Sequence, residues 1–195
     1  MINAIILAAG ESRRMGKPKP LLRFEDTTFL EQIVSVLRLS CVDRITVVLG
    51  AKAKAIQKSI DLSGTNVVIN KNYHKGQLSS LIAGLENTPA EAEAILVCLV
   101  DNPFITTTLV DQIVGVFKNT KGPIVVPVFN KKRGHPALFA KSLFKELINA
   151  PAQEGARYVL YSNEDKVVEL QMSDSATLVR IDTPDDYRSY FGTAP

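Results

Sequence analysis

The sequence predicts a doubly wound α/β fold, in which helices cover both faces of a mostly parallel sheet. Short runs of β-forming residues alternate along the chain with segments whose apolar residues recur at helical spacing. The inner runs are almost continuously apolar, as expected of parallel strands that are buried on both faces. The chain has 195 residues and no internal repeat or linker. We therefore expect residues 1–195 to form a single domain.

The expected elements follow one another in this alternating order. Strands are predicted at residues 4–8, 44–49, 66–69, 94–99 and 123–127, and in the last third at 166–170 and 178–181. Helices are predicted at residues 28–39, 52–60, 78–87, 108–118, 141–148 and 155–162. Thr28 and Glu31 form a capping box at the first helix. A last helix is expected to begin at Pro184, with Thr183 as its N-cap and two acidic residues facing the helix dipole.

Composition and charge exclude several classes of protein. Hydrophobic residues make up 46% of the chain and charged residues 22%, as in ordinary soluble domains. The longest apolar run, residues 94–100, is far shorter than the roughly 20 residues that a membrane span needs. The N-terminus lacks a secretion signal, and Cys41 and Cys98 match no metal or redox spacing, so we expect a cytoplasmic protein without a membrane partner. The net charge of +3 is concentrated in one loop, which argues against a nucleic-acid partner.

That basic, glycine-containing loop, residues 7–22, follows the first expected strand. Ligands of open α/β sheets bind beyond the carboxyl ends of the strands, where this loop must lie. Arg14 can grip phosphate oxygens in bidentate fashion, and Lys19 supplies a compact cation. Small residues allow backbone N–H groups to approach a nucleotide closely. The residues expected to do so are Leu7, Ala8, Ala9 and Gly10.

The spacing within the loop excludes two familiar phosphate-binding motifs. Five residues separate Gly10 from Gly16, and Pro18 follows Lys17, whereas a Walker A loop has four residues between its glycines and Ser or Thr after its Lys. The dinucleotide fingerprint G-x-G-x-x-G is absent as well. The loop therefore predicts an anion site of another kind.

Residues 7–22 resemble L-A-A-G-x-S-x-R-M-G-x-P-K-x-L-L, the signature of the MobA-like nucleotidyltransferases. Within that superfamily the chain is most similar to molybdenum cofactor cytidylyltransferases of the MocA type. The resemblance implies a Rossmann-like three-layer α/β sandwich with a mostly parallel, mixed central sheet, of the nucleotide-diphospho-sugar transferase type. It also implies transfer of a nucleoside monophosphate from an NTP to a phosphorylated acceptor, with release of pyrophosphate. Arg14, Lys19 and Asp101 would be the catalytic residues.

Two acidic residues are candidates for a divalent metal, which nucleotidyl transfer needs to neutralise the triphosphate. Asp101 directly follows the apolar run 94–100, and Val100-Asp101-Asn102-Pro103 resembles the family's metal-binding G-D-x-P motif. The departures are Val100 for Gly and Asn102 for the usual Gln or Met. Two carboxylates with phosphate oxygens and water suit Mg²⁺, with Mn²⁺ as the alternative.

Asp182 is the second candidate metal ligand. Residues 181–187 resemble the family segment D-I-D-T-P-E-D-Y, in which Arg180 stands at the position of the first Asp. The competing interpretation is that Asp182 only serves the N-terminus of the last helix.

The segment from Asn70 to Leu81 resembles the family's N-x-x-x-x-x-G-x-x-S-S-L, whose turn and helix start contact the base and ribose. We expect nucleotide contacts from Asn70, Gly76, Ser79 and Ser80. The alternative for the serines is that one of them simply caps the helix.

Residues 133–139 resemble the R-G-H-P-x-L-F segment on the acceptor side of MocA-like proteins. The resemblance implies that Gly134, His135 and Pro136 bind the acceptor, although a lone His is often structural. A general base is not expected here, because a phosphate monoester acceptor is already largely ionised near pH 7.

The analogy names CTP as donor and molybdopterin as acceptor, with a molybdoenzyme or its chaperone receiving the product. Ala9 favours CTP over GTP, because the related guanylyltransferases typically carry Gly there and the extra methyl group acts as a steric filter. The alternatives are a GTP-dependent guanylyltransferase and a sugar-phosphate or polyol-phosphate nucleotidyltransferase. A non-catalytic NTP-binding cofactor chaperone is a further alternative, although retention of Arg14, Lys19 and Asp101 together favours an enzyme.

Overall fold

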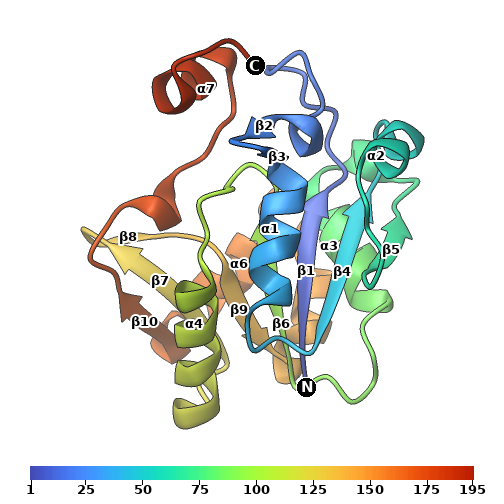
Figure 1. Cartoon of the computed structure of the whole chain (residues 1–195). Coiled ribbons are helices and arrows are strands. Elements are labelled where there is room, and N and C mark those ends of the chain that lie inside the picture. The colour runs from blue at the N-terminus through green and yellow to red at the C-terminus, as the bar shows by residue number, and fades with distance from the viewer.

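The computed structural model describes residues 1–195 and confirms the predicted α/β sandwich (Figure 1). Its eight-stranded sheet has the order β10-β7-β9-β6-β1-β4-β5, with β8 paired to β7, and β2 and β3 form a separate two-stranded ribbon. The strands are β1 (Ile2–Ala8), β2 (Arg23–Phe24), β3 (Thr27–Thr28), β4 (Arg44–Leu49), β5 (Asn66–Ile69), β6 (Ala94–Leu99), β7 (Ile124–Phe129), β8 (Lys132–Arg133), β9 (Ala137–Ala140) and β10 (Val167–Gln171).

Helices lie on both faces of this sheet. α1 (Phe29–Arg38) and α4 (Thr107–Thr120) cover one face, while α3 (Gln77–Glu86), α5 (Phe144–Asn149) and α6 (Ala156–Ser162) cover the other (Figure 1). The remaining α-helices are α2 (Ala53–Ser59) and α7 (Pro184–Phe191). Five short 3₁₀ helices complete the structure: η1 (Lys19–Leu21), η2 (Tyr73–Lys75), η3 (Lys141–Leu143), η4 (Glu164–Lys166) and η5 (Ala176–Leu178).

Most of the predicted elements are confirmed within a residue or two. The bounds of β4, β5 and β6 agree with the prediction, and Thr28 and Glu31 form the expected capping box of α1. Thr183 caps α7, where Asp186 completes a second capping box. The helix expected over residues 141–148 is divided into η3 and α5.

Two features of the sheet differ from the prediction. β8 and β9 were not expected: β9 runs antiparallel to both of its neighbours, β6 and β7, and β8 runs antiparallel to β7. The strand predicted at residues 178–181 is wrong, because its backbone groups bond to turns instead of to a strand. Leu178 N donates to Ser175 O at 2.9 Å, and Ile181 N donates to Asp101 O at 2.8 Å. We call residues 176–182, which comprise η5 and the segment that leads to α7, the C-terminal arm.

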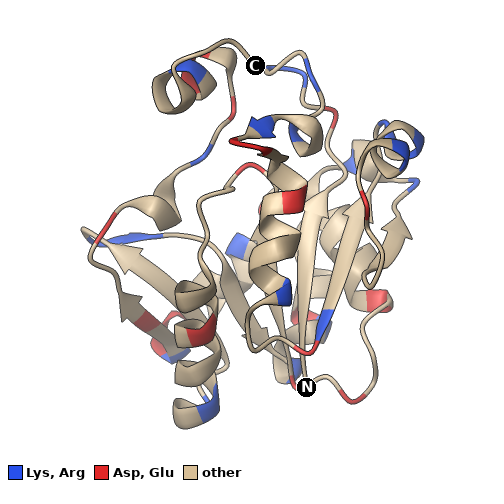
Figure 2. Cartoon of the chain, viewed as in Figure 1, with Lys and Arg blue, Asp and Glu red and all other residues tan.

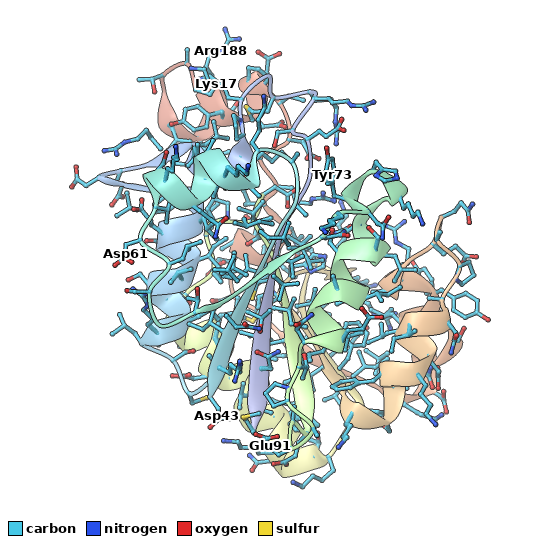
Figure 3. All side chains as sticks on the ribbon, turned by 90° about the vertical axis from the view of Figure 1, so that its right-hand side faces the viewer. Lys17, Asp43, Asp61, Tyr73, Glu91 and Arg188 are labelled. Atoms are coloured by element: carbon cyan, nitrogen blue, oxygen red, sulfur yellow. The ribbon has the colours of Figure 1, made fainter.

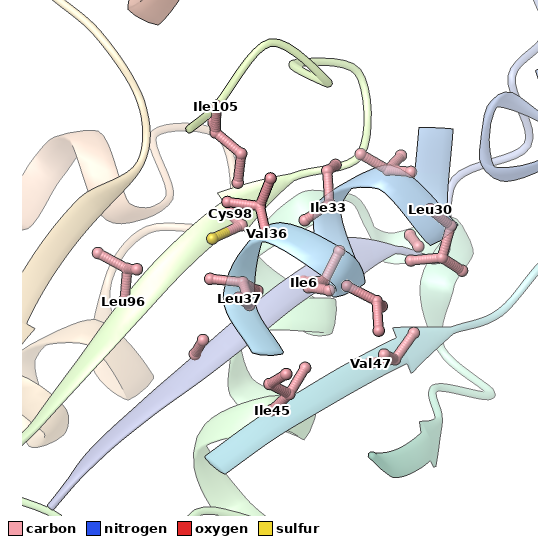
Figure 4. Packing of buried hydrophobic residues seen from close by; sticks show 14 of the residues in the cluster. Ile6, Leu30, Ile33, Val36, Leu37, Ile45, Val47, Leu96, Cys98 and Ile105 are labelled. Carbon is pink, nitrogen blue, oxygen red and sulfur yellow. The ribbon is translucent and has the colours of Figure 1, made fainter. Parts of the chain in front are cut away.

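Residues of the central strand, β1, point alternately into two hydrophobic cores, so both faces of the sheet are buried. Ile2, Ala4 and Ile6 of β1 belong to the core under α1 and α4, whereas Ile5 and Leu7 belong to the core under α3, α5 and α6. Figure 4 shows the first core, in which side chains of α1 pack against Ile6 of β1 and against neighbours from β4 and β6. This two-sided packing fixes the strand register and thus the positions of the loops beyond the strand ends.

The parallel strands β1, β4, β5 and β6 end at the same edge of the sheet. In Figure 3, Lys17, Tyr73 and Arg188 lie toward this end of the molecule, and Asp43 and Glu91 lie at the opposite end. The loop after β1 and the C-terminal arm approach the carboxyl edge from different sides (Figure 1). No helix of the structure is long and apolar enough to cross a membrane.

Candidate functional site

A cleft of about 320 Å³ opens at the carboxyl ends of β1 and β6. Its walls come from the loop after β1, the turn and helix start between β5 and α3, the end of β6 and the C-terminal arm. Most of the residues expected to form the site lie in this lining. They are Leu7, Ala8, Ala9, Gly10, Arg14, Lys19, Gly76, Ser80, Asp101 and Asp182.

The remaining candidates lie outside the cleft lining. Asn70 is buried and donates through Nδ2 to Ser79 Oγ at 2.9 Å and to Ser80 Oγ at 3.0 Å, so it braces the start of α3. Ser79 Oγ donates in turn to the carbonyl of Gly76 at 2.8 Å. Gly134, His135 and Pro136 lie behind the wall that Asp101 and the C-terminal arm form, and do not line the cleft.

The cleft also contains residues that the sequence did not single out for the site. Ser12 and Arg13 belong to the predicted loop, whereas Arg180 stands in the sequence only as a departure from the family motif. The sequence signal for Arg180 was its charge, because it is a cation two residues before Asp182 on a segment that leads into a capped helix. The residues missed are Ser12, Arg13, Pro20, Tyr73, Gln77, Leu99, Val100 and Arg180.

The loop after β1 is anchored at both ends of its turn. Ser12 adopts a positive φ of 55°, and its carbonyl accepts from Met15 N and Gly16 N, both at 3.0 Å. Its hydroxyl accepts from Lys19 N at 3.0 Å. Met15 is buried, so the turn is fixed to the core while the side chain of Arg14 stays exposed at the cleft. The loop therefore holds its backbone and cations in place at the cleft.

Two carboxylates and three cations meet at the floor of the cleft. Lys19 Nζ lies 3.0 Å from Asp101 Oδ2 and 2.5 Å from Asp182 Oδ1, so it bridges the acids. Arg180 Nη2 lies 2.9 Å from Asp101 Oδ2, and Arg14 Nη2 lies 3.3 Å from Asp182 Oδ2. Burial would raise the pKa of Asp182, but Lys19, Arg180 and Arg14 outweigh it and hold that pKa below its usual value.

One carboxylate oxygen of this cluster has no hydrogen-bond partner. Asp101 Oδ1 is buried and has no hydrogen-bond partner within the chain. An unpaired carboxylate oxygen beside a second carboxylate is a donor set that fits a hard divalent cation completed by phosphate oxygens and water. Asp101 and Asp182 are therefore the residues that could hold such an ion.

Long-range contacts place Asp182 beside Asp101. The backbone bond between Ile181 and Asp101 ties the C-terminal arm to the end of β6, and Asn102 Nδ2 donates to Thr177 O at 3.2 Å. Asp186 Oδ2 accepts from the backbone N–H groups of Asp182 and Thr183 at 3.0 and 2.8 Å. Capping of α7 is thus performed by other residues, and the carboxylate of Asp182 pairs with the cleft cations.

The Gly134–His135 turn packs directly against the arm. A Cβ atom on Gly134 would lie 2.5 Å from the carbonyl oxygen of Thr177, so no side chain fits there. Burial, with the charges of Arg180 and Arg157, lowers the pKa of His135 to about 4, although Asp101 raises it. His135 is therefore neutral at pH 7, and its Nδ1 has no partner within the chain.

Replacing this histidine should change how stability depends on pH. An unfolded His titrates near 6.5, above the folded pKa of about 4, so the unfolded state binds more protons between these values. Stability should rise with pH across that window, by up to about 3 kcal/mol, and then level off. His135→Gln should remove this rise, whereas His74→Gln, in an exposed turn, should keep it. Urea unfolding between pH 4.5 and 7 measures the difference, and equal slopes in all three proteins would contradict the prediction.

Taken together, these features define a class of protein. A backbone-rich loop, cations and a carboxylate pair at the carboxyl edge of a mostly parallel sheet suit an α/β enzyme that handles nucleoside triphosphates. Residues 4–167 match the MobA-like NTP transferase domain, and the chain belongs to that family. It is therefore a nucleotidyltransferase.

Similar proteins of known sequence cover nearly the whole chain. The molybdenum cofactor cytidylyltransferase of Escherichia coli K12 is 27% identical over 95% of this chain and 93% of its own length. The nicotine blue oxidoreductase of Paenarthrobacter nicotinovorans is also 27% identical, over 93% and 92%. A probable molybdenum cofactor guanylyltransferase of Bacillus cytotoxicus is 31% identical over 68% and 65%. The names of these relatives describe different reactions, so they do not define the substrates of this chain.

Solved structures also resemble this chain over nearly its whole length. The crystal structure of Rv0371c from Mycobacterium tuberculosis H37Rv superimposes with a TM-score of 0.89 at 31% identity, covering 98% of this chain and 97% of that chain. A crystal structure of Rv0371c in complex with manganese gives a TM-score of 0.84 at 29% identity, with 99% of both chains covered.

Proposed function

We propose that this enzyme transfers CMP from CTP to the phosphate group of molybdopterin and releases pyrophosphate. The observation that carries the proposal is the cleft floor, where Lys19 bridges Asp101 and Asp182 beside Arg14. The relative named molybdenum cofactor cytidylyltransferase supports the acceptor and the base. The product would pass to a molybdoenzyme or its chaperone.

The N-terminal loop is proposed to bind the triphosphate. The backbone of Leu7, Ala8, Ala9 and Gly10 lines the cleft beside the cations of Arg14 and Lys19. A phosphate oxygen of the acceptor attacks the α-phosphorus, the bond between the α-phosphorus and its bridging oxygen breaks, and pyrophosphate leaves with that oxygen. Arg14 and Lys19 stabilise the negative charge that develops on the departing group. No general base is needed, because the attacking phosphate is already ionised.

Asp101 and Asp182 are proposed to hold a divalent cation, Mg²⁺ with Mn²⁺ as the alternative. The unpaired Oδ1 of Asp101 supports this assignment, and Rv0371c was crystallised with manganese. The ion would supply charge neutralisation for the triphosphate. The acids themselves need only stay ionised and correctly placed, which the cations around Asp182 favour.

The base and ribose are proposed to lie against the other wall. Gly76 and Ser80 line the cleft opposite the loop, and Asn70 with Ser79 holds the helix start in position behind them. The methyl group of Ala9 favours CTP over GTP. Gly134, His135 and Pro136 would act on the acceptor side through the arm that they support, because they do not line the cleft.

A direct assay tests the proposal. Purified protein is incubated with Mg²⁺, each NTP in turn and molybdopterin, and pyrophosphate release and product mass are followed. CTP should give pyrophosphate and a cytosine dinucleotide product. Higher activity with GTP would reassign the base, and turnover only with a sugar or polyol phosphate would reassign the acceptor. Nucleotide binding without turnover would support the non-catalytic chaperone alternative.

A further inference from the structure

The cations of the cleft come from two different walls. Arg13, Arg14 and Lys19 belong to the loop after β1, whereas Arg180 belongs to the C-terminal arm. Figure 2 shows positive segments both in the loop after β1 and in the arm that leads to α7. Two separated sets of cations suit two separate anionic groups.

One edge of the Arg180 guanidinium is bonded within the chain, and the other edge has no partner there. Its Nη2 bonds to Asp101 Oδ2 at 2.9 Å and lies 3.9 Å from Asp182 Oδ2. Its Nε and Nη1 make no hydrogen bond within the chain, and 46% of its side chain is exposed, compared with 11% for Asp101. Guanidinium donors lie in a rigid fork that matches phosphate oxygens. Arg180 therefore retains donors for an anion from outside.

The arm that carries Arg180 is fixed in place. Its backbone is bonded at Ile181 to Asp101 and at Thr177 to both His135 and Asn102. Gly134 lies against Thr177 with no room for a side chain between them. The guanidinium is thus preorganised instead of being ordered on binding.

The distance between the two sets of cations suits two reacting phosphates. Arg180 Nη2 and Lys19 Nζ both bond to Asp101 Oδ2, at 2.9 and 3.0 Å, so they lie no more than about 6 Å apart. The acceptor phosphate and the α-phosphate must approach each other although both are negatively charged. A cation on the acceptor side reduces that repulsion and positions the attacking oxygen.

We propose that Arg180 binds the phosphate monoester of the acceptor, so that the enzyme selects acceptors by that group. This inference rests on the proposed nucleotidyl transfer. It assigns the N-terminal loop to the donor triphosphate and Arg180 to the acceptor phosphate, both beside the carboxylate pair.

The test uses phenyl phosphate as a probe monoester. It is titrated into the protein saturated with Mg²⁺ and α,β-methylene CTP, and binding is followed by calorimetry. Arg180→Ala should weaken phenyl phosphate binding by about 10- to 100-fold, the loss of a charged hydrogen-bond partner. Arg180→Lys should restore part of the affinity, because it keeps the charge without the fork. The affinity for the CTP analogue should fall less than the affinity for phenyl phosphate, because Arg180 reaches the triphosphate only through Asp101, which it shares with Lys19.

Arg188→Ala is the matched control. Arg188 also lies near the C-terminus and also pairs with an acid, Asp185, but it lies outside the cleft lining, on α7 (Figure 3). This variant should bind phenyl phosphate like the unmodified protein. Circular dichroism of all variants checks that the arm still folds.

Three results would overturn the inference: no binding of phenyl phosphate to the unmodified protein, unchanged binding to Arg180→Ala, or an equal loss of affinity for the CTP analogue. The last would place Arg180 on the triphosphate. Failure of the proposed function is distinguishable, because Arg180-dependent phenyl phosphate binding without turnover of CTP and molybdopterin would reject the reaction but keep the anion site.

Discussion

Asp101→Asn should reduce the rate of pyrophosphate release by about a thousandfold, because it removes several kcal/mol of charge stabilisation. The substitution keeps the shape of the side chain and its position at the end of β6. It replaces the buried, unpartnered Oδ1 and its carboxylate with a neutral amide, which is a much weaker ligand for a hard cation. Mn²⁺ binding, followed by electron paramagnetic resonance, should weaken in parallel.

The same substitution should not weaken binding of CTP in the absence of metal. Lys19 bonds to Asp101 Oδ2, so removing that negative charge leaves the cleft more positive and frees this cation for phosphate. Calorimetry without metal should therefore show an equal or higher affinity. Asp185→Asn is the control, because Asp185 is exposed on α7 and outside the cleft lining. Full activity of Asp101→Asn would reject the metal assignment.

The sequence predicted the parts of the site that depend on local chemistry. The loop after β1 and Asp101 could be found because small residues, cations or an acid directly follow an apolar strand. The position of a strand end is set by the apolar pattern, and here β6 ends where that pattern ends. Local sequence therefore located both the loop after β1 and the carboxylate beside it in the cleft.

The C-terminal arm could not be predicted in the same way. Its apolar residues resemble a short strand, yet its backbone partners are Asp101 and His135, far away in the sequence. Alternation of apolar residues does not reveal such partners. For the same reason Arg180 was visible only as a departure from a motif, while its contact with Asp101 depends on how the arm crosses the sheet edge.

Lys19→Met should lower turnover by about 100- to 1000-fold, because the ammonium that stabilises the departing pyrophosphate is lost while the length of the side chain is kept. Lys17→Met is a matched control from the same loop. Lys17 lies outside the cleft lining, and its Nζ bonds to the carbonyl of Pro195 at 2.5 Å. Its turnover should remain within about twofold of the unmodified protein.

In Lys19→Met, the affinity of the nucleotide-free protein for a divalent metal should rise, although turnover falls. Lys19 Nζ occupies oxygens of both Asp101 and Asp182, so it competes with a divalent cation for the same carboxylates. Removing it should tighten Mn²⁺ binding by about tenfold, the value of one charged hydrogen bond at the lower limit. Weaker Mn²⁺ binding would instead mean that Lys19 organises the acids for the metal. A rise in affinity with a loss of turnover would show that the triphosphate must draw Lys19 away from the acids before the metal site is complete.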